Sequence, residues 1–364
     1  PAAAVPVIRG LTGDRILVLQ DGQRTGDLAG SADDHATTVD PLAASRVEVV
    51  RGPAALLYGN NALGGVVNVV SNDVPLDGPS RVQGAIAGQA ESAYAGGGVS
   101  ARLVAPLGEG WAVMVRGGGR ETGDVRIGGD PVLGDRLANT GLRALHGVVG
   151  LGYSGTTVRA GGAVRAYDFR YGIPTPPDAE PMRWAGRRLE GVARLETDLP
   201  FERFPALHLD ATVQSYEHDE GEIDGTIANR FELSTQSATA RLDQAEVGRL
   251  GRGSWGVSGL RKAYTGTGQD ALTPPAESWA VGLFGFQQIE LGVPTLQFGA
   301  RVDRYVIESE RADGFGPGRE RTFDALSGSA GPVVPFSSTL TGPVSVSRAF
   351  RAPTVEELFS SSLH

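Results

Sequence analysis

The feature that most limits the fold of this chain is a recurring alternation of apolar and polar residues from about residue 81 onward. Each run is about ten residues long, the length that a tilted strand needs to cross a bilayer. In the run 207–216 one face would carry Leu207, Leu209, Ala211 and Val213, and the other His208, Asp210, Thr212, Gln214 and Tyr216. The pattern predicts antiparallel strands with one apolar face, and the polar face suits the lumen of a barrel.

The links between these runs are of two kinds. Short links lie at 108–110 and 292–294, whereas 121–140, 172–186, 218–230 and 310–321 are long and polar. Short turns on one side and long loops on the other are typical of outer-membrane barrels. The runs predict roughly a dozen strands.

Five aromatic residues lie within or near the ends of such runs: Trp111, Trp255, Trp279, Tyr264 and Tyr305. Aromatic girdles at the two membrane interfaces would place residues there. Ordinary packing between strands would do so as well. The sequence contains no stretch of about 18 apolar residues, so it predicts no transmembrane helix. The mean hydropathy of −0.12 is compatible with a barrel.

The first 80 residues predict a compact α+β unit. Residues 16–19 form a continuous apolar run, as in a strand buried on both faces. Asp40 and Pro41 fit the N-cap and first position of a short helical turn. The stretch 46–71 predicts a strand, a turn at Gly52-Pro53, one helical turn, a glycine bend and a second strand rich in valine.

Three segments resemble the TonB-dependent outer-membrane receptors. They are PVIRGLTGDRILVLQDGQRTGD (6–27), RVEVVRGPAALLYGNNALGGVVNVVS (46–71) and SRAFRAPTVEELF (347–359). The resemblance implies a mainly β protein, an antiparallel transmembrane β-barrel, partial here, with the second half of an α+β plug domain. It implies that 1–80 belong to the plug and 81–364 to an incomplete barrel. The early plug, the energy-coupling segment and the last strands would be missing.

The same resemblance implies a receptor in the bacterial outer membrane, driven by a TonB-like energy-transducing protein and embedded in outer-membrane lipid. It implies no enzyme and no tightly bound cofactor. The net charge of −9 argues against nucleic acid as a partner. Two alternatives stay open: a surface adhesin without transport, and a hydrolase. The hydrolase would need a serine and a histidine within hydrogen-bonding reach, although no Gly-x-Ser-x-Gly motif is present.

The cluster Asp33-Asp34-His35 combines carboxylates and an imidazole, which suit Zn²⁺ or a similar divalent metal. A solvated loop is the plainer interpretation. The segment 34–42 is similar to a plug loop of zinc receptors, and His364 matches a barrel histidine of that branch. The resemblance thus implies a partial metal site of Asp34, His35 and His364, with a fourth ligand, a carboxylate, unassigned.

Zinc or another divalent metal is therefore the expected cargo, and a siderophore or other metal chelate is the alternative. The loop after Tyr171 begins like a loop that is rich in histidine in some zinc receptors but has none here, so we do not expect it to capture metal, and a metal complex or other small cargo stays open. We interpret His208 and His218 as ordinary polar residues of the lumen or loops. Acidic residues beside His218 could also attract cations at an extracellular loop.

Arg51 and Glu48 are candidates for attaching the plug to the barrel. In the family, an arginine of the RGP segment pairs with barrel carboxylates, and Arg51 occupies that position here. A buried arginine needs paired acceptors, because an isolated buried charge is costly. A local ion pair inside the plug is the alternative.

Overall fold

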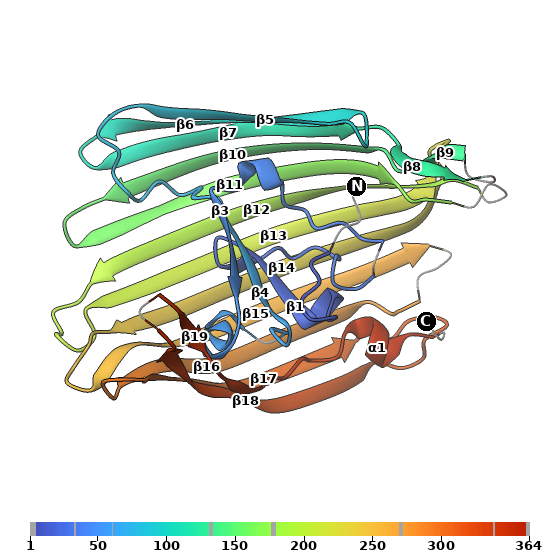
Figure 1. Cartoon of the computed structure of the whole chain (residues 1–364). Coiled ribbons are helices and arrows are strands. Elements are labelled where there is room, and N and C mark those ends of the chain that lie inside the picture. The colour runs from blue at the N-terminus through green and yellow to red at the C-terminus, as the bar shows by residue number, and fades with distance from the viewer. Residues whose placement is uncertain are drawn as a thin grey trace.

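The computed structural model describes residues 5–32, 34–59, 61–130, 134–175, 180–268, 272–337 and 339–361. These residues form a large curved antiparallel sheet, a small four-stranded sheet on its concave side, and a separate two-stranded hairpin (Figure 1). The predicted fold class, a partial β-barrel with a plug, is confirmed. None of the helices in this part of the chain is long and apolar enough to cross a membrane.

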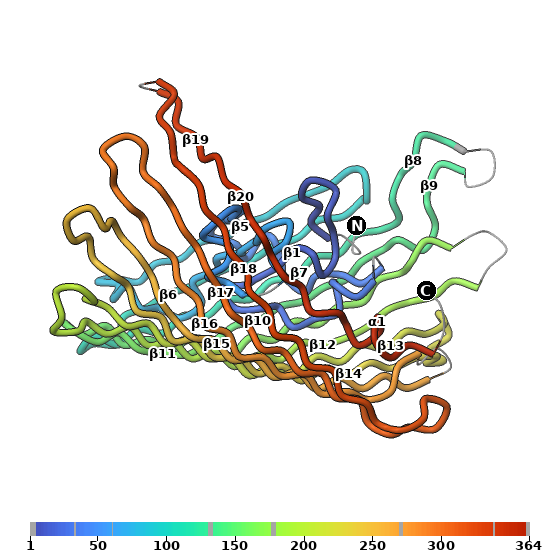
Figure 2. The backbone as a smooth tube through the Cα atoms, turned by 90° about the horizontal axis from the view of Figure 1, so that it is seen from below, coloured from blue at the N-terminus to red at the C-terminus, as the bar shows by residue number. Residues whose placement is uncertain are grey.

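The large sheet is an open barrel wall. Its strand order is β19-β18-β17-β16-β15-β14-β13-β12-β11-β10-β7-β6-β5, and β20 also pairs with β18. The strands are β5 (Gln83–Glu91), β6 (Gly96–Gly108), β7 (Trp111–Thr122), β10 (Leu142–Ser154), β11 (Val158–Gly172), β12 (Met182–Asp198), β13 (Ala206–Glu222), β14 (Ile227–Gln244), β15 (Leu250–Gly268), β16 (Ala276–Glu290), β17 (Thr295–Ser309), β18 (Arg319–Pro335), β19 (Thr341–Pro343) and β20 (Val346–Arg348). Within the described ranges β5 and β19 do not pair, and the wall curves around the plug without closing (Figure 2).

The alternation along β13 has the predicted two faces. Leu209 and Val213 point outward with exposed fractions of 39% and 62%, whereas Thr212 and Gln214 are 5% and 3% exposed on the inner face. The inner polar residues lie beneath the plug: Ser237 of β14, for example, donates to Gln23 of the plug over 3.0 Å. The outward apolar face is the surface that a bilayer would cover.

The prediction of a long link at 218–230 is wrong. β13 continues to Glu222 and β14 begins at Ile227, so most of that segment belongs to the two strands. Charged residues extend the ladder instead of opening a loop, because Arg230 makes two hydrogen bonds across the strands to Asp219, of 2.6 and 2.8 Å. The link 121–140 carries the hairpin of β8 (Val125–Asp130) and β9 (Gly134–Leu137).

The aromatic prediction holds only in part. Trp111, Trp255 and Trp279 are exposed on the outward face, with exposed fractions of 44%, 46% and 37%. Tyr264 and Tyr305 are only 9% and 8% exposed and pack in inner clusters. For these two the girdle prediction is wrong, because their place in the strand alternation turns them inward.

The plug sheet has the order β2-β1-β4-β3, with β1 (Ile16–Gln20) and β4 (Gly65–Val70) parallel. β2 (Gln23–Arg24) and β3 (Arg46–Val50) are antiparallel to their neighbours. The core contains Leu17, Leu19, Ala55, Ala62 and Val66, and β1 is buried on both faces as predicted. Its short helical turns are 3-10 helices at Gly13–Arg15, Pro41–Ala43 and Pro53–Tyr58.

Two local predictions in the plug region are confirmed at atomic detail. The Asp40 side chain caps the turn Pro41–Ala43 by accepting a hydrogen bond from the Leu42 amide over 2.8 Å. The bend before β4 places Gly65 at a φ of 136°, a conformation that disfavours other residues. Near the C-terminal end, α1 (Val355–Phe359) begins with a capping box between Thr354 and Glu357.

Candidate functional site

The histidine of the Asp-Asp-His cluster lies at the interface between plug and barrel. His35 is 7% exposed and follows the β2 strand in a loop of the plug. Its Nδ1 lies 3.1 Å from the Leu28 carbonyl oxygen, which can only accept a hydrogen bond. That contact places a proton on Nδ1 and directs Nε2 away from the plug, toward the barrel wall.

Two side chains of β13 meet Nε2 of His35 from the barrel. Glu220 Oε1 lies 3.2 Å from it and 3.9 Å from Nε2 of His218. Because residues two apart on a strand share a face, both side chains point to the plug. One ligand atom from each of His35, His218 and Glu220 lies within 4.8 Å of the other two. Among the described residues, this is the group of side chains that could hold a metal ion.

His218 is a buried polar group that lacks protein hydrogen bonds. It is 1% exposed, and neither ring nitrogen has a hydrogen-bond partner among the described residues. Its ring packs between aromatic rings instead, with centroids of Phe169, Tyr216 and Phe231 at 6.1, 6.1 and 5.8 Å. An unsatisfied buried polar group costs about 1–3 kcal/mol. A metal ion bound to Nε2 would satisfy that nitrogen, although not Nδ1.

The protonation of His35 is linked to the same contacts. Burial lowers the pKa of His35, but the hydrogen bond to Glu220 and the charges of Asp34 and Glu220 outweigh this and raise the pKa above its ordinary value. With Nδ1 hydrogen-bonded to Leu28, a proton on Nε2 is what Glu220 accepts. A metal ion at this place would replace that proton.

The predicted ligands have different outcomes. His35 faces the site, and Asp34 Oδ1 lies 3.9 Å from His35 Nε2 with 42% of its side chain exposed. Tyr171 holds the loop by donating to the Asp34 carbonyl and accepting from the Ala36 amide, both over 3.0 Å. His364 and Asp33 lie outside the described residues.

Sequence reasoning gave His218 and its acidic neighbours only a weak role in attracting cations at an extracellular loop, and it did not group His218 and Glu220 with His35. His218 lies on the inner face, as expected of a polar lumen residue, but directly beside His35: the two ring centroids are 4.9 Å apart. The available signal was the pair of a histidine and a glutamate two residues apart on one strand face. Sequence alone could not connect that pair to the plug loop.

A cavity of about 920 Å³ opens next to the site. Asp34, His35 and Glu220 line one side of it. Arg351, Glu356 and Glu357, at and just before α1, line another part. Cavities of 300–1,000 Å³ are the usual size of small-molecule sites, so this one has room for a chelated metal as well as a free ion.

Among the described residues, the proposed anchoring residues Arg51 and Glu48 have no ion pair with the barrel wall. Glu48 accepts hydrogen bonds from Arg46 Nε over 2.7 Å and from Asn68 Nδ2 over 3.0 Å, both within the plug. This is the local alternative for Glu48. Arg51 is exposed and has no ion pair with a described residue, so its anchoring role stays a prediction.

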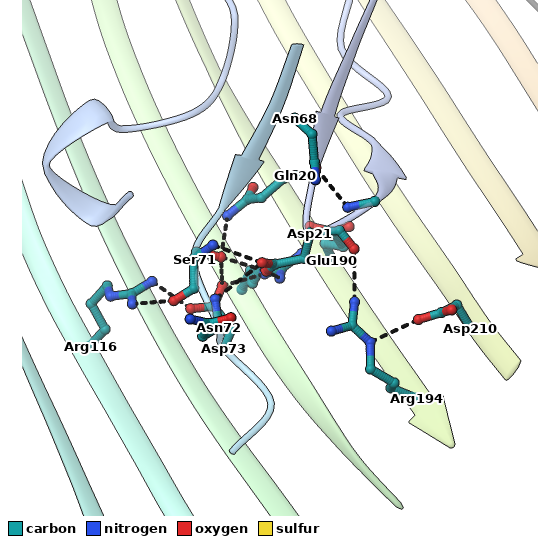
Figure 3. Close-up of polar contacts among 12 residues, drawn as sticks. Gln20, Asp21, Asn68, Ser71, Asn72, Asp73, Arg116, Glu190, Arg194 and Asp210 are labelled. Atoms are coloured by element: carbon teal, nitrogen blue, oxygen red, sulfur yellow. Dashed lines mark hydrogen bonds and ion pairs between the residues drawn. The ribbon is translucent and has the colours of Figure 1, made fainter. Parts of the chain in front are cut away.

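Buried charges elsewhere attach the plug to the wall (Figure 3). Asp73, just after the plug sheet, accepts from Arg116 Nη1 over 2.5 Å and from Arg165 Nε over 2.7 Å. Arg165 also pairs with Asp21 of the plug and, over 3.2 Å, with Glu190 of β12. These side chains are between 0% and 4% exposed. Because each charge has an opposite partner, the network avoids the cost of an isolated buried ion.

A second group of contacts extends this anchor along the wall. Arg188 Nη2 donates to Gln20 Oε1 over 2.7 Å, and Arg194 Nη2 donates to the Asp21 carbonyl over 2.8 Å. Burial raises the pKa of the Asp21 carboxyl, but the charge of Arg165 and hydrogen bonds from Ser71 and the Asn72 amide outweigh it and lower the pKa. Asp21 is therefore ionised at neutral pH, as the anchor requires.

A serine and a histidine lie within hydrogen-bonding reach of each other, as the hydrolase alternative requires, and an aspartate contacts the same histidine. Ser100 Oγ is 3.3 Å from His146 Nε2, and His146 Nδ1 is 2.8 Å from Asp40 Oδ2. Ser100 is only 5% exposed, and Asp40 comes from the plug. The seam between plug and wall encloses the three side chains, so a substrate carbonyl has no approach to Oγ.

Comparison with known proteins gives the same architecture. Residues 1–66 match the TonB-dependent receptor plug domain, and residues 97–363 match the TonB-dependent receptor-like β-barrel. A hemin receptor of Yersinia pestis is 49% identical over 61 residues, which are 17% of this chain and 9% of that protein. A hemin receptor of Yersinia enterocolitica is 46% identical over 66 residues, 18% of this chain and 9% of that protein.

Solved structures share the fold at low sequence identity. The copper transporter OprC superposes with a TM-score of 0.80 at 15% identity over 98% of this chain and 58% of its own. The hemophore receptor HasR of Serratia marcescens superposes with a TM-score of 0.77 at 16% sequence identity. The match covers 97% of this chain and 58% of the HasR chain. This chain thus spans well under two thirds of either structure. The two matched domains cover most of its length, and the chain belongs to the TonB-dependent receptors, which are outer-membrane β-barrel proteins of Gram-negative bacteria and not enzymes.

Proposed function

We propose that this chain belongs to a receptor for active uptake of a scarce nutrient, and that its cargo is a divalent transition-metal ion such as zinc. The single observation that carries the proposal is the cluster of His35, His218 and Glu220. Energy would come from a TonB-like protein.

The donor set suits the ion. Zinc takes imidazole nitrogens and carboxylate oxygens at about 2.0–2.2 Å in tetrahedral geometry, which puts neighbouring ligand atoms ~3.4 Å apart. The separations of 3.2 and 3.9 Å around Glu220 are close to that value. All three ligand atoms lie within 4.8 Å of one another, so shifts of about 1 Å would bring them to the spacing of zinc ligands. Asp34 or water would be the fourth ligand.

Calorimetric titration of the detergent-purified full-length receptor with zinc chloride tests the proposal. A His35→Ala/His218→Ala variant should bind zinc at least a hundredfold more weakly, because two of three protein ligands are lost. His208→Ala is the matched control, since His208 lies on the inner face of the same strand but is 2.9 Å from Asp243. Equal affinities of the double variant and the wild type would refute the zinc site.

A metal chelate is the second candidate cargo. The cavity of about 920 Å³ beside the cluster favours it, and the Yersinia relatives are hemin receptors. His35 would then hold the metal of the chelate through Nε2, which faces away from the plug core. Hemin that binds the wild type but not His35→Ala, with no zinc binding by either, would assign the chelate.

A further inference from the structure

The two carboxylate oxygens of Glu220 have different partners. Oε1 lies 3.2 Å from Nε2 of His35 and 3.9 Å from Nε2 of His218. Oε2 accepts a hydrogen bond from Nδ2 of Asn229 over 3.1 Å. An ionised carboxylate only accepts hydrogen bonds, so it is the amide nitrogen of Asn229 that faces Glu220. The proposed cargo site therefore contains a carboxylate with one oxygen already engaged.

The strand ladder holds Asn229 opposite Glu220. The two residues are directly paired in the antiparallel register of β13 and β14. Asn229 is 4% exposed and, like Glu220, lines the cavity of about 920 Å³. The register shifts immediately after this pair, between Glu220 and Gly221. Bulges are common beside functional sites, where they redirect side chains.

Gly268 of β15 leaves room for the Asn229 amide on the other side. It is opposite Asn229 in the register of β14 and β15, and its φ is 127°. A Cβ atom at this position would come within 2.6 Å of Asn229 Oδ1. A larger residue would fill the space that the amide occupies. The Asn229 side chain is thus placed by the strands on both sides of β14.

The hydrogen bond limits how Glu220 can bind a metal ion. Because Asn229 engages Oε2, an ion in the cluster meets two imidazole nitrogens and the single oxygen Oε1. Zinc accepts such a donor set in tetrahedral geometry. Manganese and calcium prefer six or more ligands, mainly oxygen, and calcium often takes both oxygens of one carboxylate. A Glu220 that offers one oxygen therefore favours the smaller ion.

We propose that Asn229 is a positioning residue that holds Glu220 with one oxygen toward the two histidines and thereby selects zinc-like ions over larger, oxygen-liganded ions. The inference rests on the proposed cargo site. Asn229 acts through Glu220 and does not bind the ion itself. Hydrogen bonds that orient metal ligands in this way typically change metal affinity by about 10–100-fold.

A purely structural role for Asn229 predicts a different result. Its loss would then loosen the end of the β13–β14 ladder and weaken the binding of every ion by the same factor. Loss of a positioning residue instead changes the ratio of affinities between ions, because the freed carboxylate can turn both oxygens toward a larger ion. The ratio of zinc to manganese affinity therefore separates the two roles.

The test is calorimetric titration of the detergent-purified full-length receptor with zinc chloride and with manganese chloride. Asn229→Leu keeps the approximate shape of the side chain but has no donor. It should weaken zinc binding at least tenfold and change manganese binding less than threefold. The strong visible absorption of tetrahedral Co²⁺ bound to the wild type should weaken in the variant.

Thr212→Val is the matched control. Thr212 and Ser237 share a hydrogen bond of 2.8 Å between the same two strands, away from the cluster. Removing it should leave both affinities within threefold of the wild type. If Asn229→Leu does not fold, Asn229→Gln and Asn229→Ala replace it: the glutamine keeps an amide donor and should preserve the ratio of zinc to manganese affinity, whereas the alanine should lower it.

Two outcomes would overturn the inference alone. The first is zinc binding that is lost in His35→Ala/His218→Ala but unchanged in Asn229→Leu. The second is an equal loss of zinc and manganese affinity in Asn229→Leu, or an equal ratio in Asn229→Gln and Asn229→Ala. A wild-type receptor that binds no zinc would refute the proposed cargo site and this inference together, so the two failures are distinguishable.

Discussion

Removing the Arg165 side chain should detach the plug from the barrel wall at its buried anchor. Arg165 is 3% exposed and is shared by Asp21, Asp73 and Glu190. Arg165→Met keeps the length of the side chain but leaves these carboxylates with too little positive charge. Breaking a buried ion pair by deleting one partner costs about 3–5 kcal/mol. We expect the free energy that holds the plug in place to fall by that amount, while the ladder of β11 stays intact.

Hydrogen exchange of the full-length receptor in detergent measures this change. Exchange of amides in β1 and β4 reports local opening of the plug, and a loss of 3–5 kcal/mol accelerates it about 10²- to 10³·⁵-fold, at tenfold per 1.4 kcal/mol. Arg304→Met is the matched control, because Arg304 and Asp324 are 59% and 68% exposed and such pairs contribute only about 0–1 kcal/mol. Equal exchange in both variants would refute the anchor.

Three further predictions concern the cargo site, the serine–histidine pair and the outward face. Because the pKa of His35 is raised, its hydrogen bond to Glu220 is present at low pH and is lost as pH rises through that pKa. Zinc affinity should increase over the same pH range, because zinc replaces the proton on Nε2. Calorimetry between pH 5 and 8 that shows no increase in zinc affinity would contradict this prediction. Ser100→Ala should leave p-nitrophenyl acetate hydrolysis at the background rate of the wild type, since Ser100 and His146 are enclosed; a fall in rate would revive the hydrolase. Leu283 is 63% exposed on the outward face. Leu283→Arg should lower the free energy of unfolding of the barrel in liposomes by about 2–4 kcal/mol, as an arginine does near the bilayer midplane. If Leu283→Arg and Leu283→Ala unfold at the same urea concentration, the assignment of Leu283 to the lipid-facing surface is wrong.

The sequence predicted the barrel well where one physical rule dominates. When apolar and polar residues alternate over ten residues, only a strand with one apolar face and one polar face fits the pattern. The outward position of Leu209 and Val213 therefore followed directly from the sequence. Charge in a link is a weaker guide, because it fits a loop and a strand end equally. That is why His218–Glu222 was assigned to a loop, although cross-strand pairing keeps it in β13.

The candidate site was only half predictable for a similar reason. The amino-acid sequence of the plug loop identified His35 as a candidate ligand, but its partner Glu220 is 185 residues away in the sequence. Contacts between the plug and the wall depend on how the wall curves around the plug, and side-chain alternation gives no information about that curvature. The anchor shows the same limit: Asp21 and Asp73 look like ordinary turn residues until Arg165 is placed between them.

The division of the proposed ligands between plug and barrel has a thermodynamic consequence for transport. An ion that needs His35 from the plug and His218 and Glu220 from the wall binds tightly only while the plug is docked. By linkage, bound cargo stabilises that docked state, by about 2.7 kcal/mol at a hundred times its Kd. Cargo therefore adds to the anchor of Arg165 instead of releasing it. Release must come from a force on the plug, and once His35 moves away the two remaining ligands hold the ion more weakly, so the same motion that opens a path also lowers the affinity.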